Sequence, residues 1–177
     1  MINGFEIRED ITAIFLNGKH GEMETLIDTI DLPRAQEFEG RWYPIRDRRT
    51  KSFYVGGSLK LEPGKWTTIQ LHRWITNAPP NMLVDHYNHQ TLDNRHEHNL
   101  RLCSIGENNR NRQVSSGSSK YKGVDWHNFR KKYRARIKVN SKSIHLGHFD
   151  TELEAALAYN RAAIEHHGAF AKLNNLT

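Results

Sequence analysis

The chain has almost no cysteine and no long apolar segment. Its single cysteine, Cys103, cannot form an internal disulfide or supply a Cys-rich zinc site by itself. No apolar run approaches the roughly 20 residues that a membrane-spanning helix needs. The opening stretch MINGFEIRED carries acidic residues where a secretory signal would have a basic flank and an apolar core. These absences argue against disulfide-stapled and membrane-spanning proteins and predict a cytoplasmic protein.

Acidic residues are scarce beyond the first 40 positions. Residues 1–40 hold three Lys or Arg against nine Asp or Glu, a net charge of −6, whereas residues 41–177 hold 23 against 11, a net charge of +12. A basic globular segment with no amphipathic membrane helix points first to nucleic acid, because phosphates attract clustered Lys and Arg. The other interpretation is a basic surface that is merely solvated.

The length of 177 residues allows one domain or two small ones. Strands are expected over 11–16, 23–28 and within 42–71, with a short helix over 31–38 that begins after Asp31. The Ser- and Gly-rich stretch RQVSSGSSK at 112–120 is typical of a flexible linker. We therefore expect an N-terminal module over 1–112, a linker over 113–120 and a C-terminal domain over 121–177.

The C-terminal domain has the most regular pattern. Three strands are expected over 121–127, 132–139 and 143–149, followed by a helix that opens with a capping box of Thr151 and Glu154. The apolar stripe of this helix is expected to be Leu153, Ala156, Leu157, Ala163 and Ile164, packed on one face of the sheet. In KYRARIKV the alternation is strict, so the four cations point away from that helix. Such a row suits a polyanion, although a solvated sheet face is the alternative.

This C-terminal third resembles the APETALA-two/ethylene-response-factor DNA-binding domain over residues 119–175. The resemblance rests on Gly123–Val124, on the LGHF ending of the third strand and on EAALAY in the helix. In that family the three strands lie in the major groove and the helix supports them. Asp125 stands where the family usually has arginine, and His145 where it usually has tryptophan. The DNA contacts that the resemblance implies are Lys122, Trp126, Lys132, Arg134, Arg136, Lys138 and His145.

The stretch VDHYNHQTLDNRHEHNLRLC at 84–103 concentrates four histidines and three asparagines. It is expected to form a strand over 83–87, a long turn, a strand over 100–103 and then a short helix over 104–111. In such an arrangement Asp85 and Asn108 could share an oxygen-liganded divalent ion, with His86 beside it. A neutral imidazole and one divalent ion suit phosphodiester hydrolysis. The alternative is a polar hairpin whose side chains cap turns.

Residues 71–112 are similar to the HNH endonucleases of the phage and intron homing type, and the front segment resembles the region that precedes their nuclease motif. The similarity implies that Asp85 is a metal ligand, His86 the general base, Asn99 the brace of the loop and histidine, and Asn108 the second metal ligand. The spacing in RHEHNL is one residue longer than expected, so Asn94 is a rival to Asn99 for the middle position. Further contacts to the DNA backbone are expected from Arg95, Arg101, Arg110 and Arg112.

The prediction is thus an α+β protein with an N-terminal α+β module that carries a ββα-metal nuclease motif at about 70–112. A three-stranded antiparallel sheet packed on one helix follows the linker. The expected function is site-specific homing cleavage of double-stranded DNA with one Mg²⁺ or Mn²⁺, in a phage or bacterial cytoplasm. The alternatives are a non-catalytic DNA-binding regulator and a zinc-stabilised module that uses the histidines with Cys103. A monomer and a dimer are both compatible with the sequence.

Overall fold

The computed structural model describes residues 1–48, 50–112 and 117–176, and it divides into two compact units. The first unit is Met1–Cys103 and the second is Ser104–Thr177. The division lies between the last strand of the expected nuclease motif and the helix that follows it. That helix, which we had assigned to the N-terminal module, therefore belongs to the C-terminal unit. Of the expected linker, residues 113–116 lie outside the described part of the chain.

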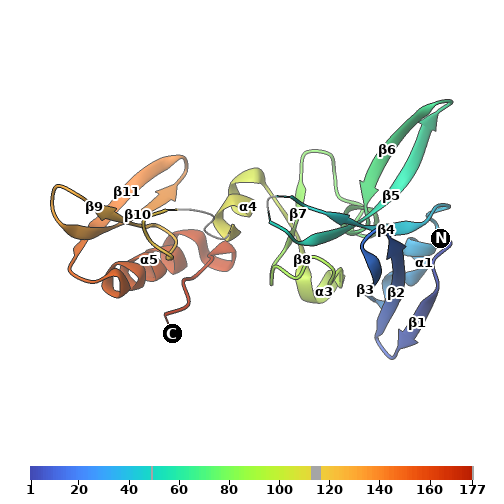
Figure 1. Cartoon of the computed structure of the whole chain (residues 1–177), viewed down its shortest axis with the longest axis horizontal. Coiled ribbons are helices and arrows are strands. Elements are labelled where there is room, and N and C mark those ends of the chain that lie inside the picture. Colours follow the sequence, from blue (N-terminus) through green and yellow to red (C-terminus); the bar gives the residue numbers. More distant parts are fainter. Residues whose placement is uncertain (49, 113–116, 177) are drawn as a thin grey trace. The chain divides into compact units, whose positions relative to one another are not determined.

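The first unit contains two three-stranded antiparallel sheets and one hairpin (Figure 1). One sheet has the order β1-β2-β3 and the other the order β4-β5-β6, and the hairpin pairs β7 with β8. The strands are β1 Phe5–Arg8, β2 Ile11–Gly18, β3 Gly21–Asp28, β4 Trp42–Arg46, β5 Phe53–Glu62, β6 Lys65–Gln70, β7 Leu83–His86 and β8 Leu100–Cys103. The helices are η1 Thr29–Asp31, α1 Leu32–Gln36, α2 Leu71–Ile75 and α3 His96–Asn99. The sequence predicts the strands β2 to β8 and the helix α1, whereas β1 was not predicted and α3 replaces part of the expected long turn.

The core of the first unit joins the two sheets to the short helices. Phe38 and Trp42 stack with ring centroids 4.1 Å apart, and Trp74 packs edge-on against Phe38. Gly57 permits this packing, because a Cβ at that position would lie 2.5 Å from the ring of Phe38. These aromatic side chains thereby hold α1 and α2 against the β4-β5-β6 sheet. Along the chain, α2 follows β6 and precedes β7.

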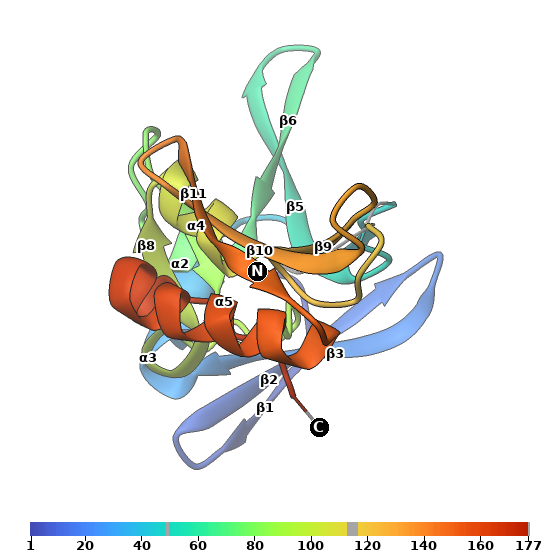
Figure 2. The same cartoon turned by 90° about the vertical axis from the view of Figure 1, so that its left-hand side faces the viewer.

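The second unit is a three-stranded antiparallel sheet covered on one face by a helix (Figure 2). Its elements are α4 Ile105–Asn111, β9 Val124–His127, β10 Lys132–Val139, β11 Lys142–Phe149, α5 Glu152–His167 and η2 Gly168–Phe170. The predicted capping box is present, since Thr151 Oγ1 accepts from the amide of Glu154 and the Glu154 side chain accepts from the amide of Thr151. A capping box of Ser104 and Glu107 likewise begins α4.

The helix α5 packs on the sheet mainly through small residues, and of the predicted stripe only Ala156 and Ala163 are buried. Ala155, Ala156, Tyr159, Ala162 and Ala163 are buried against β9, β10 and β11. In contrast, the predicted core residues Leu153, Leu157 and Ile164 are exposed. A face of alanines lets the helix axis approach the sheet closely, which the larger side chains would prevent. No helix in the described part of the chain is long and apolar enough to span a membrane.

Candidate functional site

The face of the β9-β10-β11 sheet that points away from α5 carries the predicted cations; we call it the free face. Arg134 lies directly opposite Asp125 on β9 and His148 on β11, and Arg136 lies opposite His145. Directly paired residues in an antiparallel sheet project from the same face. Tyr133, Ala135 and Ile137 project from the other face into the core. The alternation predicted for KYRARIKV is therefore present in β10.

A bulge brings two histidines to the free face from one strand. The β10–β11 register shifts between Ala135 and Arg136, so that His145 and His148 both pair with free-face residues. The imidazole of His148 lies 4.6 Å from that of His145 and 5.0 Å from that of His127, measured between ring centroids. Burial and the neighbouring charged and imidazole groups lower the pKa of His148. Strict alternation could not identify His148, because only the bulge places it on this face.

Lys132, Arg134 and Arg136 of the free face are paired with carboxylates. Asp125 accepts from Arg134 at 2.7 Å and from Arg136 at 3.1 Å. Lys132 pairs with Asp150 at 3.0 Å, and both of these side chains are exposed. The free face thus carries both cationic and anionic side chains, and the carboxylates orient the cations with which they pair.

Trp126 does not lie on the free face. It is directly opposite Tyr133, and the two rings meet edge-on with centroids 4.9 Å apart. Since Tyr133 packs against the core cluster, Trp126 projects towards the α5 side of the sheet. This placement differs from the DNA contact that the resemblance implied for Trp126.

Lys122 also has a different position from the one expected. Its Nζ donates to the main-chain carbonyl of Arg110 and, at 2.7 Å, to that of Arg112. Burial lowers the pKa of Lys122 to about 8, with Lys172 and Arg112 adding repulsion. The part-buried ammonium group joins the end of α4 to the start of β9, so these two carbonyls compete with a phosphate for its donors.

Arg110 and Arg112 lie on a basic groove next to the free face. The groove has a volume of about 880 Å³ and is bordered by α4 and by the turn that joins β10 to β11. Arg136 and Lys138 of the free face form part of its lining. The two arginines predicted to hold the DNA backbone are thereby placed beside the cations of β10.

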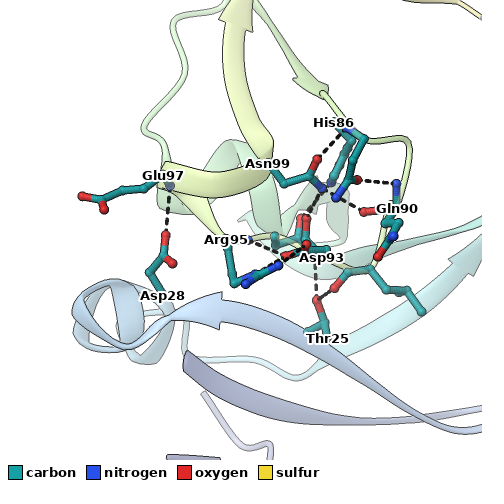
Figure 3. A network of polar contacts seen from close by, with 11 residues as sticks. Thr25, Asp28, His86, Gln90, Asp93, Arg95, Glu97 and Asn99 are labelled. Atoms are coloured by element: carbon teal, nitrogen blue, oxygen red, sulfur yellow. Dashed lines mark hydrogen bonds and ion pairs between the residues drawn. The ribbon is translucent and has the colours of Figure 1, made fainter. Parts of the chain in front are cut away.

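In the first unit, His86 lies at the end of β7 within a buried polar network (Figure 3). Its Nε2 is 3.2 Å from Oδ1 of Asn94, and the Asn94 amide donates to Thr25 Oγ1 at 2.8 Å. Burial lowers the pKa of His86, and the hydrogen bond to Asn94 opposes that shift. The ring of His72, which the sequence did not single out, lies 4.9 Å away, and burial lowers its pKa to about 3.

Asn99 holds the loop that follows His86. Its side-chain amide donates to the carbonyls of Gln90 at 3.0 Å and Asp93 at 2.7 Å, and its Oδ1 accepts from the amide of Asn88 at 2.9 Å. The two asparagines that were candidates for the middle position of the expected motif therefore have different contacts. Asn99 fixes the loop backbone, whereas Asn94 contacts the histidine.

The acidic front segment supports the same loop. The amide of Leu26 donates to the carbonyl of Leu92, and the amide of Asn94 donates back to Leu26, so the loop extends the edge of β3. Asp28 accepts from the amide of Glu97 at the start of α3 (Figure 3). The front segment, whose role the sequence left open, packs against the candidate nuclease loop.

The remaining predicted groups of the first unit are engaged in ion pairs. Arg101 donates to Oδ2 of Asp85 through two nitrogens, at 2.8 and 3.0 Å, from the directly opposite position on β8. Arg95 forms a two-pronged pair with Asp93 at 2.8 Å. Arg101 and Arg95, expected on the DNA backbone, are thus bound to neighbouring carboxylates.

Asp85, one of the two predicted metal ligands, is engaged in an ion pair in this structure. A metal needs free carboxylate oxygens, and Oδ2 of Asp85 accepts two hydrogen bonds from a guanidinium instead. The other predicted ligand, Asn108, belongs to α4 in the second unit. Within the described ranges, no three His, Cys, Asp or Glu side chains are grouped so as to hold a metal, and Cys103 is buried.

The family model of the AP2 domain matches residues 119–169, the segment that forms the sheet and α5. The chain thus contains an AP2 domain. Its AP2 domain is similar to that of plant proteins, for example APETALA2-like protein 2 of Oryza sativa, 49% identical over 79 residues that cover 44% of this chain and 16% of the rice protein. An ethylene-responsive transcription factor of Arabidopsis thaliana is 32% identical over 143 residues, 75% of this chain and 32% of that protein.

A viral relative matches a larger share of its own length. The HNH endonuclease of Acanthamoeba polyphaga mimivirus, named as uncharacterized, is 32% identical over 133 residues, which cover 70% of this chain and 67% of the viral protein. This AP2-domain protein therefore belongs to the same protein family as the viral chain. It spans only about a third of the Arabidopsis protein.

Proposed function

We propose that this AP2-domain protein binds double-stranded DNA in a sequence-specific manner through the free face. The observation that carries the proposal is the row of Lys132, Arg134, Arg136 and Lys138 on the side of β10 away from α5. The AP2 domain is a DNA-binding domain, and the plant relatives are named as transcription factors. The sequence-specific regulator that the sequence offered as an alternative is supported better than the nuclease.

The geometry of a strand suits the DNA groove. Side chains two residues apart on one strand are about 6.6 Å apart, so four such cations extend along about 20 Å. The major groove, about 12 Å wide, admits a strand pair whose arginines can donate to guanine while lysines contact phosphate. Arg134 and Arg136 occupy the middle of the row, where base edges would be reached, and Lys132 and Lys138 occupy its ends.

The proposal is tested with the full chain and a preferred duplex selected from random sequences. Replacing Lys138 by Ala should weaken binding to all duplexes and lower the salt slope of log K by about 1. Replacing Arg136 by Ala should cost about 1–3 kcal/mol on the preferred duplex and less on others. Arg161→Ala is the matched control, because Arg161 is an exposed residue of α5, on the opposite side of the sheet. Equal effects of all three substitutions would contradict the proposal.

A second candidate function is endonuclease activity with His86 as general base. It is favoured by the hairpin that presents His86 next to Asp85, by the loop that Asn99 fixes and by the name of the viral relative. A neutral imidazole can take a proton from water, and Mg²⁺ or Mn²⁺ would supply charge stabilisation on the scissile phosphate. Because Asp85 is paired with Arg101, we derive no step through a metal.

A cleavage assay decides between the two functions. Supercoiled DNA that contains the selected site is incubated with the protein and Mg²⁺ or Mn²⁺. An endonuclease would nick or cut it, and His86→Ala would bind the same site without cutting. His98→Ala, which changes an exposed histidine of α3, should cut like the unaltered protein. If the unaltered protein binds the site without cutting it, the endonuclease function is excluded and sequence-specific DNA binding remains.

A further inference from the structure

A carboxylate lies among the cations of the free face. Asp125 is the second residue of β9 and lies directly opposite Arg134 on β10. Its Oδ2 accepts from Nη2 of Arg134 at 2.7 Å, and its Oδ1 accepts from Nε of Arg134 at 3.4 Å. Nε of Arg136 is also 3.1 Å from Oδ1. One carboxylate therefore orients two guanidinium groups.

This contact leaves part of each guanidinium free to donate to other groups. A guanidinium has five N–H donors in a fixed plane, and Arg134 uses the edge formed by Nε and Nη2 on Asp125. Its remaining donors lie on the opposite edge of the same plane. Because Arg134 is held at one edge, the direction of the other edge is set before DNA arrives. Less conformational freedom is then lost when those donors meet a base.

The same carboxylate opposes binding that depends on charge alone. Asp125 reduces the charge of the pair Arg134 and Arg136 from +2 to +1, and it would lie close to the phosphates of bound DNA. Non-specific affinity comes almost entirely from the phosphate contacts, so it falls with the charge of the face. Asp125 would thus orient the side chains that contact bases and lower the affinity for non-specific DNA. Both effects raise the ratio of specific to non-specific affinity.

We propose that Asp125 is a positioning residue that sets the sequence specificity of the AP2 domain, by fixing the planes of Arg134 and Arg136 and by lowering non-specific affinity. The inference rests on the proposed function. It differs from a purely structural role for the ion pair, because partly exposed pairs of this kind add little to stability. A structural pair would also leave the base preference unchanged.

The test is selection from a random duplex library with four forms of the full chain: unaltered, Asp125→Ala, Asp125→Asn and Asp150→Asn. Asp150→Asn is the matched control. It likewise removes one negative charge, here from the carboxylate that pairs with Lys132, and it leaves the two arginines paired with Asp125. Asp125→Asn keeps the shape of the side chain and one acceptor oxygen, so it covers the case in which the alanine variant does not fold.

Both Asp125 variants should lose base preference at the one or two positions that Arg134 and Arg136 read, while the other positions stay as before. The ratio of affinities for the selected and a scrambled duplex should fall about tenfold for Asp125→Ala and less for Asp125→Asn. Affinity for the scrambled duplex should rise severalfold for both, and also for Asp150→Asn, whose base preferences should stay unaltered.

Two outcomes overturn the inference. If the Asp125 variants keep every base preference and differ from the unaltered protein only as Asp150→Asn does, Asp125 acts through charge alone. If the unaltered protein enriches no sequence, the proposed function is wrong and the inference falls with it. The first outcome leaves the proposed function intact, so the two failures are distinguishable.

Discussion

Gly123 is the position at which a single added methyl group should disturb the AP2 domain most. Its φ of +75° lies in the left-handed region, and a Cβ there would lie 2.0 Å from Cδ2 of Tyr159 and 2.7 Å from the carbonyl oxygen of Arg136. The left-handed backbone costs an L-residue about 1–2 kcal/mol, and overpacking a core costs about 1–3 kcal/mol. Because Tyr159 is buried among core residues, its ring cannot move aside freely. Gly123→Ala should therefore destabilise the second unit by about 2–5 kcal/mol.

Hydrogen exchange followed by mass spectrometry measures this loss within the second unit alone. Peptides from β10 and α5 report its opening free energy, while peptides from β2 and β3 in the first unit should exchange as before. Gly168→Ala is the matched control, because its φ is +53° and its Cβ would meet nothing within 4 Å. It should show a backbone cost without the cost of the clash. Equal losses for the two variants would refute the argument that the ring of Tyr159 requires glycine at 123.

Two further substitutions test the roles that the structure gives to Asn99 and Lys122. Asn99→Ala removes three hydrogen bonds of the loop over 88–93 and should lower the stability of the first unit by about 2–4 kcal/mol in urea unfolding; a loss below about 0.5 kcal/mol would contradict the bracing role. The pKa of Lys122 in the folded chain is about 8, below its ordinary value of 10.5. Between these two pKa values the unfolded chain binds more protons than the folded chain, so the free energy of unfolding should rise with pH in that range. Lys122→Met should remove that part of the rise and speed amide exchange over 105–111, and an unchanged pH profile would argue against the buried ammonium.

Local sequence patterns were sufficient where the structure depends on neighbours in the chain. The period of two in KYRARIKV predicted which side chains of β10 face the core, and the spacing of Thr151 and Glu154 predicted the start of α5. Both features are set by backbone geometry within a few residues. The same holds for β2, β3 and the hairpin of β7 and β8.

The sequence pattern did not predict which of two apolar faces of α5 is buried. Leu153, Leu157 and Ile164 were assigned to the core of α5, and they are 48%, 42% and 59% exposed. The buried face holds Tyr159 and alanines, among them the predicted Ala156 and Ala163, because the sheet lies close to the helix. A helix with small residues on one face and large apolar residues on another does not reveal from its sequence which face is covered.

The candidate site showed the same limit. The resemblance to HNH endonucleases related His86 to Asn99 and to its rival Asn94, and all three lie on one hairpin and its loop. Residue type and spacing could not show that Asp85 pairs with Arg101 or that the amine of Lys122 is bound to main-chain carbonyls. Such partners depend on the register of strands and on the docking of α4, which no local pattern specifies.

The central claim is that the free face of the β9-β10-β11 sheet reads DNA, and nuclear Overhauser effects between the protein and a selected duplex test it most directly. The account predicts contacts from the side chains of Arg134 and Arg136 to base protons in the major groove, with none from Arg161 on the outer side of α5. Contacts to DNA from α5 and not from β10 would contradict it.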